Sequence, residues 1–311
     1  MDRWDQVVAD YGESYYRLRS DQLMENVRAD LTVLHSLIAA ADGPERKPLL
    51  RATSRLSVVV ALGMVAAGQI LIAGRWWRDA YEYAVKSGDK DSILHARAWS
   101  VVNGCYDRRD PGDVVALSDE VMPLTAGRSS AEACGLLAGR AQALSLAGRH
   151  SEAIDTVRQL ADASEKMPAN VANGVHSLWG WPEHRLRHTE AWVYAHSGTL
   201  VDATKAQERA IELYPPQMTR LRTQVQLHHA AAMIRSRQIL DGLRLAASAL
   251  ESLPAENHNE LLRTVIRQVV HSVPTEARKR PEYREVTDLL RGRSYDLLLE
   301  SRPGFGSSYG L

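Results

Sequence analysis

Residues 191–215 read AWVYAHSGTLVDATKAQERAIELYP, and this stretch decides the fold. Two runs of helix-forming residues flank Gly198, and Pro215 ends the second run. Glycine favours a turn between two helices and proline stops a helix, so the stretch predicts a hairpin of two antiparallel helices. Ala191 and Ala203, twelve positions apart, would let the two backbones approach closely.

The same pairing of small residues, twelve positions apart, recurs five times along the chain. The pairs are Gly68/Ala80, Gly104/Ala116, Ala141/Ala153, Ala191/Ala203 and Ala230/Gly242. Their second members stand 36, 37, 50 and 39 residues apart. Intervals of this size are typical of stacked helical hairpins of about 34 residues, each of which buries its apolar face only against its neighbours.

The composition agrees with an all-α fold. Ala, Leu, Arg and Glu dominate the 311 residues, which favours helix, and no stretch alternates with the period of two expected of a strand. Lys and Arg balance Asp and Glu at 38 each, so the charge gives no reason to expect direct nucleic-acid binding. The two cysteines do not suggest a secreted disulfide framework, and we expect a cytoplasmic protein.

One uncharged run, Leu56–Gly74, is about as long as a membrane span. It contains three glycines, and Arg55 and Arg75 place positive charge at both ends, which gives no orientation in a membrane. We therefore expect a buried helix over residues 47–74 that stops at Gly74, and no membrane contact.

The hairpins resemble tetratricopeptide repeats. The positions that carry this resemblance are Ala141, Gly148 and Ala153 in one unit, Ala191, Gly198, Ala203, Ala210 and Pro215 in the next, and Ala230, Gly242, Ala249 and Pro254 in a third. The resemblance implies a right-handed solenoid of about five or six helical hairpins. We expect an N-terminal helical cap over residues 1–46, a repeat array over 47–300 and a flexible Gly/Ser-rich tail over 301–311.

A closer resemblance lies in three short runs. They are WGWPEHRLRHTE at 179–190, AQERAIELYP at 206–215 and QLHH at 226–229. These runs are similar to the C-terminal repeat region of actinobacterial helix-turn-helix regulators of the XRE type. In such regulators that region is taken to sense a small molecule, peptide or protein on behalf of a DNA-binding domain in front of it. The present chain begins where the sensor half would begin, and no basic recognition helix after a glycine turn is found elsewhere in it.

Candidate ligand contacts surround the longest interval between repeats. An insertion, Met167–Gly180, leads through SLWGWP at 177–182 into the next helix. Two tryptophans in a long loop can form the wall of a pocket, or they can plug the gap that the insertion opens. The candidate site residues are Trp179, Trp181, His184, Arg185, His188 and Trp192.

His184 and His188 stand four positions apart, on one face of the predicted helix. Such a pair can chelate a metal ion, but no third ligand is evident, and we predict no metal site. A polar groove surface and a ligand contact are the other interpretations. Arginines recur in successive units at positions 108, 109, 140, 185, 187 and 235. If several faced inward they would hold a carboxylate or phosphate, and solvated arginines are the alternative.

These observations predict a sensor or interaction module, of a regulatory and transcription-related kind, without a cofactor. Its concave groove would recognise a peptide or a small effector. The alternative is a biosynthetic enzyme or accessory in which His184 and His188 supply acid–base chemistry. A third interpretation is a scaffold that joins two proteins. A protein partner or a homodimer is compatible with each of them.

Overall fold

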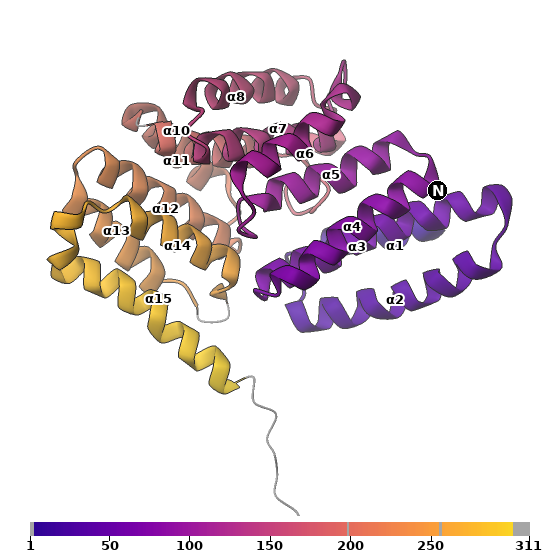
Figure 1. Ribbon diagram of the computed structural model, residues 1–311, viewed down its shortest axis with the longest axis horizontal. Helices are drawn as coiled ribbons and strands as arrows, with labels where there is room; N and C mark the ends of the chain where they lie inside the picture. The colour runs from indigo at the N-terminus through magenta and orange to yellow at the C-terminus, as the bar shows by residue number, and fades with distance from the viewer. Residues whose placement is uncertain (1–2, 198, 255–256, 301–311) are drawn as a thin grey trace, which may run out of the picture.

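The computed structural model of the protein describes residues 3–197, 199–254 and 257–300, with side chains as far as residue 290. Every regular element within those ranges is a helix, and the fold is 80% helical (Figure 1). The expected all-α class is therefore confirmed. Gly198, predicted as a turn residue, and the tail over 301–311 lie outside the described residues.

The helices follow the chain as a series of short rods. Their bounds are α1 Arg3–Ser14, α2 Ser20–Ala40, α3 Arg46–Ala66, α4 Ile70–Ser87, α5 Lys90–Gly104, α6 Pro111–Val121, α7 Ala131–Leu146, α8 His150–Glu165, α9 Ala169–Ala172, α10 Glu183–Ser197, α11 Leu200–Leu213, α12 Thr219–Arg235, α13 Ile239–Glu251, α14 Glu260–Ser272 and α15 Pro281–Glu300. Short 3₁₀ helices lie at Gly43–Glu45, Met122–Thr125 and Thr275–Lys279.

From α3 onward the helices alternate between two layers. The inner helices α3, α5, α7, α10, α12 and α14 each pack against the next one in this series. The outer helices α4, α6, α8, α11, α13 and α15 each pack on the inner helix that precedes them. Figure 1 shows the pairs following one another along an arc, from indigo at α1–α4 to yellow at α15.

Three of the five predicted small pairs lie where the two helices of a hairpin meet. Ala141, Ala153, Ala191 and Ala203 are completely buried. At the last pair, a Cβ added to Gly242 would lie 2.7 Å from the carbonyl oxygen of Ala230. Small side chains at these positions therefore set the spacing between paired helices, as the sequence predicted.

The pair Gly68/Ala80 is wrong in register, and so is the single helix predicted over 47–74. Gly68 has φ +75° and forms the turn between α3 and α4, so α3 ends at Ala66 and Gly74 lies inside α4. Ala61 and Ala73, both fully buried, flank this turn as Ala141 and Ala153 flank the turn at Gly148, whose φ is also +75°. A glycine can make a turn or permit close packing, and here it makes the turn.

The pair Gly104/Ala116 is also wrong. Gly104 does face the partner helix, since a Cβ there would lie 2.5 Å from the Val114 side chain. Ala116, however, is exposed. The connection from Cys105 to Asp110 is longer than the turns that follow α3, α7 and α12, and the residue of α6 that meets Gly104 is Val114 rather than Ala116.

The predicted burial is confirmed for the part of the apolar run that lies in α3, whereas Leu71 and Ile72 of α4 are exposed. The segment Gly43–Ala66 is long and apolar enough to cross a membrane, but 78% of its apolar window is buried inside the protein. Within it, Ser54 Oγ donates a hydrogen bond of 2.7 Å to the carbonyl oxygen of Ala80 on α4. Helix α3 therefore behaves as a core helix, surrounded by α1, α2, α4 and α5.

The inner layer is curved so strongly that its last helix, α14, contacts its first helix, α3. Thr264 Oγ1 donates to the carbonyl oxygen of Tyr106 at 3.2 Å. Arg108 Nη2 donates to Glu260 Oε1 at 2.5 Å and adds a half-exposed ion pair to this closure. The inner faces of α5, α7, α10 and α12 are thereby brought around a common interior.

The insertion before α10 folds into a compact loop that enters this interior. Trp181 N donates to the carbonyl oxygen of Val171 at 3.0 Å, and a Cβ on Gly180 would lie 2.4 Å from the Gly174 carbonyl oxygen. Leu178 N donates to the carbonyl oxygen of Gly12 at 2.8 Å, which ties the loop to α1. The insertion and the N-terminal helix are thus one packed unit.

Candidate ligand-binding chamber

A cavity of about 160 Å³ lies inside the arc, and we call it the chamber. Its wall is built from the inner helices α5, α7, α10 and α12, from the segment after α1, and from the insertion. These elements are far apart in sequence and meet only because the stack curves.

A wider groove of about 810 Å³ adjoins the chamber and lies between the α1–α2 connection and the start of α12. Four residues line both spaces, and we call them the mouth: Tyr15, Tyr16, Arg220 and Leu221. A molecule passing from the groove to the chamber would contact these side chains.

Five of the six predicted site residues line the chamber: Trp179, Trp181, His184, Arg185 and His188. Trp192, the sixth, does not line the chamber. Its indole is completely buried against Tyr106, at 5.3 Å between ring centroids, and His228, at 4.8 Å. One helical turn beyond His188, α10 has entered the packed core.

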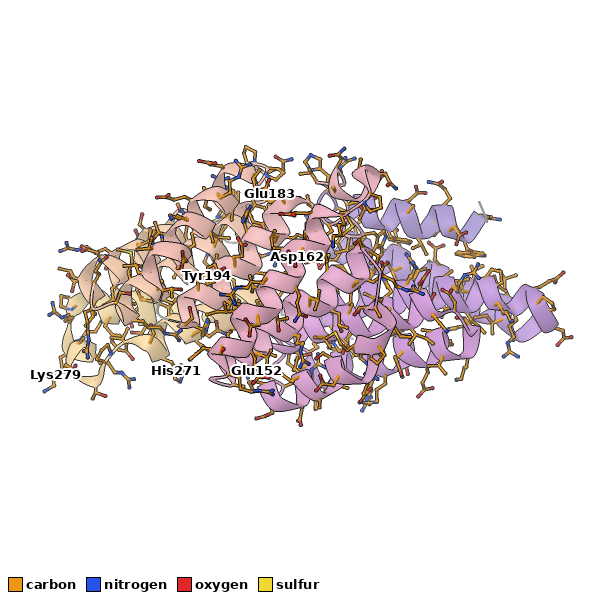
Figure 2. All side chains as sticks on the ribbon, turned by 90° about the horizontal axis from the view of Figure 1, so that it is seen from above. Glu152, Asp162, Glu183, Tyr194, His271 and Lys279 are labelled. Atoms are coloured by element: carbon orange, nitrogen blue, oxygen red, sulfur yellow. The ribbon has the colours of Figure 1, made fainter. Side chains whose placement is uncertain are left out.

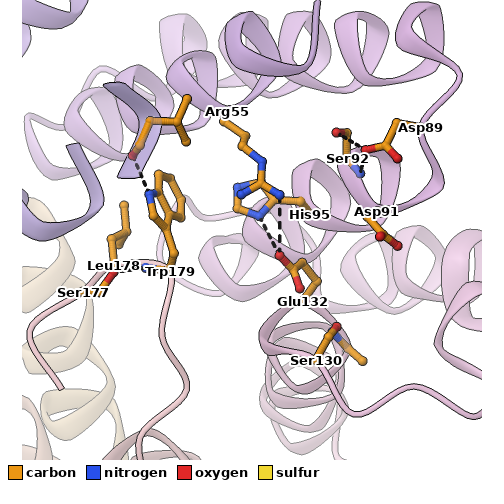
Figure 3. Close-up of polar contacts among 12 residues, drawn as sticks. Arg55, Asp89, Asp91, Ser92, His95, Ser130, Glu132, Ser177, Leu178 and Trp179 are labelled. Carbon is orange, nitrogen blue, oxygen red and sulfur yellow. Dashed lines mark hydrogen bonds and ion pairs between the residues drawn. The ribbon is translucent and has the colours of Figure 1, made fainter. Parts of the chain in front are cut away.

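The two tryptophans of the insertion fill the gap that it opens, and they also line the chamber. Trp179 Nε1 donates to the carbonyl oxygen of Val8 at 2.8 Å, and the indole lies 4.9 Å from the His95 ring and 6.1 Å from Trp99, between centroids (Figure 3). Trp181 is nearly buried, and its Nε1 donates to Ser164 Oγ at 3.0 Å. Each indole nitrogen therefore has a structural partner, and the ring faces remain for packing or for a ligand.

An ion pair holds one side of the chamber wall. Figure 3 shows Arg55 and His95 both directed at Glu132, whose Oε1 lies 4.0 Å from Arg55 Nη2 and 3.4 Å from His95 Nδ1. Burial opposes ionisation of Glu132, but the contacts with His95 and Arg55 prevail and lower its pKa to about 2. Burial and the Arg55 charge lower the pKa of His95, so the ring is neutral at pH 7 and donates its Nδ1 hydrogen to the carboxylate.

His184 and His188 share the ring of Tyr214 rather than a metal ion. His188 Nδ1 is 2.9 Å from the Tyr214 hydroxyl, and the His184 and Tyr214 ring centroids are 4.3 Å apart. Burial and nearby arginine charges lower the pKa of His184 to about 3 and that of His188 to about 4. Among the described residues, no group of three His, Cys, Asp or Glu side chains could hold a metal.

Three buried polar atoms on the chamber wall have no hydrogen-bond partner within the described part of the chain. They are His95 Nε2, Gln142 Oε1 and His188 Nε2. The three side chains are 1%, 4% and 8% exposed. An unpaired buried polar atom costs about 1–3 kcal/mol, so a concentration of them around one cavity points to a polar ligand.

Two arginines face the chamber, and sequence reasoning found only one of them. Arg185 Nη2 donates to the carbonyl oxygens of Ser177 and Leu178, at 3.3 and 3.0 Å, and to the Tyr16 hydroxyl at 3.2 Å. Arg220, at the mouth, was missed. The other predicted arginines turn to protein partners: Arg108 to Glu260, Arg109 to Asp107, Arg140 to Asp119, Arg187 to Glu190 and Arg235 to the Ala195 carbonyl oxygen.

Comparisons of the chain with protein-family models, with curated proteins and with solved structures gave no match.

Proposed function

We propose that the chain is a small-molecule-binding sensor module built as a tetratricopeptide-like solenoid, and that its ligand occupies the chamber. The alternation of inner and outer helices, with buried alanines around the turns at Gly68 and Gly148, supports the repeat architecture. The resemblance of residues 179–190 to the sensor half of XRE-type regulators supports a regulatory role.

The observation that carries the proposal is the set of unpartnered polar atoms in the wall of a partly open cavity. The side chains of His95, Gln142 and His188 line it from α5, α7 and α10, and each has a buried polar atom without a partner among the described residues. A ligand that supplied hydrogen bonds to them would recover their desolvation cost, which core packing leaves uncompensated. Ligand sites commonly combine an apolar wall with a few convergent polar groups of this kind.

The space favours a small effector over a peptide. In an open solenoid the concave interior is free for an extended chain. Here the insertion and α1 occupy much of that interior, with Leu178 and Trp179 hydrogen-bonded to the backbone of α1. What remains is a chamber of about 160 Å³, which suits a molecule of a few functional groups.

Ligand binding would act on the packing of α1. Tyr15 and Tyr16, just after α1, line the chamber beside Trp179 and Arg185 of the insertion and α10. A ligand that touches both sides binds better when they are together, so it shifts the population toward the closed arrangement. This differential contact is how the module would report occupancy to a partner.

The enzymatic alternative has weaker support. A general acid or base works best with a pKa near the working pH. The pKa values of about 3 for His184 and about 4 for His188 are far from neutral, and burial is the main cause in both cases. We therefore expect binding without turnover.

The test fills the chamber with a side chain and asks whether binding is lost. Gly135 lines the chamber on α7, and a Cβ there would meet only Ala98 and Val102, at 3.8 and 3.9 Å. Gly135→Met therefore adds a side chain to the chamber wall. Gly74→Met is the matched control, because Gly74 lies within α4, and its Cβ would meet only the Arg78 side chain, at 3.9 Å.

The full chain and both variants would be screened by ligand-observed NMR against a library of small aromatic and aliphatic compounds. We expect compounds that bind the wild type and Gly74→Met but not Gly135→Met, with unchanged circular dichroism. A library in which no compound distinguishes Gly135→Met from the wild type would overturn the proposed function.

A further inference from the structure

The charges that face the chamber do not balance. Glu132 is the carboxylate of the lining, and Arg55 and His95 already neutralise and hydrogen-bond it. Arg185 donates to two carbonyl oxygens and a tyrosine hydroxyl, which are neutral. Neither Arg185 nor Arg220 has a carboxylate partner among the residues that the structure describes. Half-buried cations in this state favour an anionic ligand, since charges interact strongly where water is scarce.

The two arginines act on the same part of the chamber. Both charges oppose the effect of burial on Tyr15, whose pKa burial raises to about 12. Both also add to burial in lowering the pKa of His188. Arg185 Nη2 donates to the Tyr16 hydroxyl at 3.2 Å, and Tyr16 lines the mouth together with Arg220. Both arginines therefore belong to the mouth end of the chamber.

The wall beside Arg185 is aromatic and apolar, and the Arg185 guanidinium carbon lies 5.6 Å from the centroid of the Trp99 ring. Trp99 and Trp179 meet edge to face, with ring centroids 6.1 Å apart, and Leu178 lies beside them in the lining. Ala98 and Val102 of α5 extend this surface. Indole faces pack well against a flat ring, which gains stacking energy beyond its buried area.

We propose that the chamber takes a small aromatic carboxylic acid, with its carboxylate between Arg185 and Arg220 and its ring against Trp99 and Trp179. This inference rests on the proposed function and gives the chemical class of the effector. A guanidinium group binds a carboxylate through two parallel hydrogen bonds, so two arginines can fix both the charge and the orientation of such a ligand. An amine would be repelled by both arginines, and a neutral analogue would leave their charges unpaired.

The experiment compares ligands that differ in charge alone. The probes are phenylacetate, phenylacetamide and phenethylamine, and the indole series of indole-3-acetate, indole-3-acetamide and tryptamine. Each would be titrated calorimetrically into the full-length wild type, Arg220→Gln and Arg75→Gln. Arg75→Gln removes the same charge from an exposed position of α4 and is the matched control.

We expect at least one acid to bind about tenfold or more tighter than its amide and its amine. Arg220→Gln should lower the affinity for that acid by about tenfold or more, because a hydrogen-bonded charge is lost. Arg75→Gln should leave the affinity unchanged. Circular dichroism of Arg220→Gln should match the wild type, since Arg220 has no hydrogen bond or ion pair within the described residues.

Three results would overturn the acid proposal: equal binding of an acid and its amine, no effect of Arg220→Gln, or no binding of any of the six probes. In each case the proposed function still stands if library compounds lose affinity for Gly135→Met. If Gly135→Met changes no binding at all, the chamber itself is not a ligand site, and both proposals fail together.

Discussion

The polar groups on the two faces of α10 differ in their pairing and in their exposure to water. On the outer face, Glu183 is exposed and pairs with Arg187 at 3.2 Å and with Arg209 at 3.3 Å (Figure 2). Arg187 also reaches Glu190, at 2.9 Å. Every charge in this network has an opposite charge beside it, and water can reach most of its members.

On the inner face the histidines are neutral and incompletely paired. His188 uses Nδ1 on Tyr214 and leaves Nε2 without a partner in the described chain. Behind it, Trp192 Nε1 and His228 Nε2 are also unpartnered. Solvent can satisfy an outward polar group at no structural cost, whereas an inward one needs a protein partner or a ligand. The two faces therefore differ in what their polar groups need, which is water on the outer face and a protein partner or a ligand on the inner face.

Among the variants that test this difference, Trp192→Ala should cause the largest loss of stability. The indole is fully buried and fills the space between Tyr106, His196 and His228, so its removal leaves a large cavity in the core. We expect the free energy of unfolding to fall by about 3–5 kcal/mol, measured by urea denaturation monitored by circular dichroism. A loss below about 1 kcal/mol would show that the inner face is not a rigidly packed core.

The second-largest effect should come from acid, which lowers the free energy of unfolding through the buried histidines of the inner face. The pKa values of His184 and His188 are lowered from 6.5 in the unfolded chain to about 3 and about 4 in the fold. Between pH 6.5 and about 4 the unfolded chain therefore binds more protons, and the free energy of unfolding falls as the pH falls. Well above pH 6.5, from about pH 7.5, both states are neutral and the contribution to the free energy of unfolding is constant.

Between pH 6.5 and 5.5, each of these two histidines should lower the free energy of unfolding by about 1 kcal/mol. Together they should lower it by about 2 kcal/mol. Urea titrations at several pH values measure this slope directly. In His188→Gln the slope should decrease by the share of one histidine, whatever the variant does to absolute stability. Identical slopes in the wild type and the variant would contradict neutral burial of His188.

The local features of the fold could be predicted from sequence because glycine, alanine and proline act over a few residues. The pairs around Gly148 and in α12–α13 were correct for this reason. Gly68 was misplaced because the same residue type serves close packing in one hairpin and a left-handed turn in another. Only the packed structure, in which Ala61 and Ala73 are the buried pair, distinguishes the two uses.

The candidate site was predicted only where it is continuous in sequence. Trp179, Arg185 and His188 lie within ten residues of an unusual insertion, so their composition drew attention to them. Arg220 and Gln142 come from other helices, and no local pattern marks them. They reach the chamber because the stack closes on itself, through long-range contacts such as Thr264 with Tyr106. The charge balance that suggests an acid therefore emerges only in three dimensions.

The smallest effect should come from the outer face. In Glu183→Gln the ion pairs with Arg187 and Arg209 are lost, but the side chain is exposed and water replaces them. Exposed ion pairs contribute at most about 1 kcal/mol, and salt screens them, so the difference from the wild type should shrink further in about 0.5 M salt. Urea denaturation at low and high salt measures both values.

Binding of the chamber ligand to Glu183→Gln should be unaffected, because Glu183 lies on the face that points away from the chamber. A large, salt-insensitive loss of stability, or a loss of binding, would mean that the two faces of α10 are coupled rather than separate.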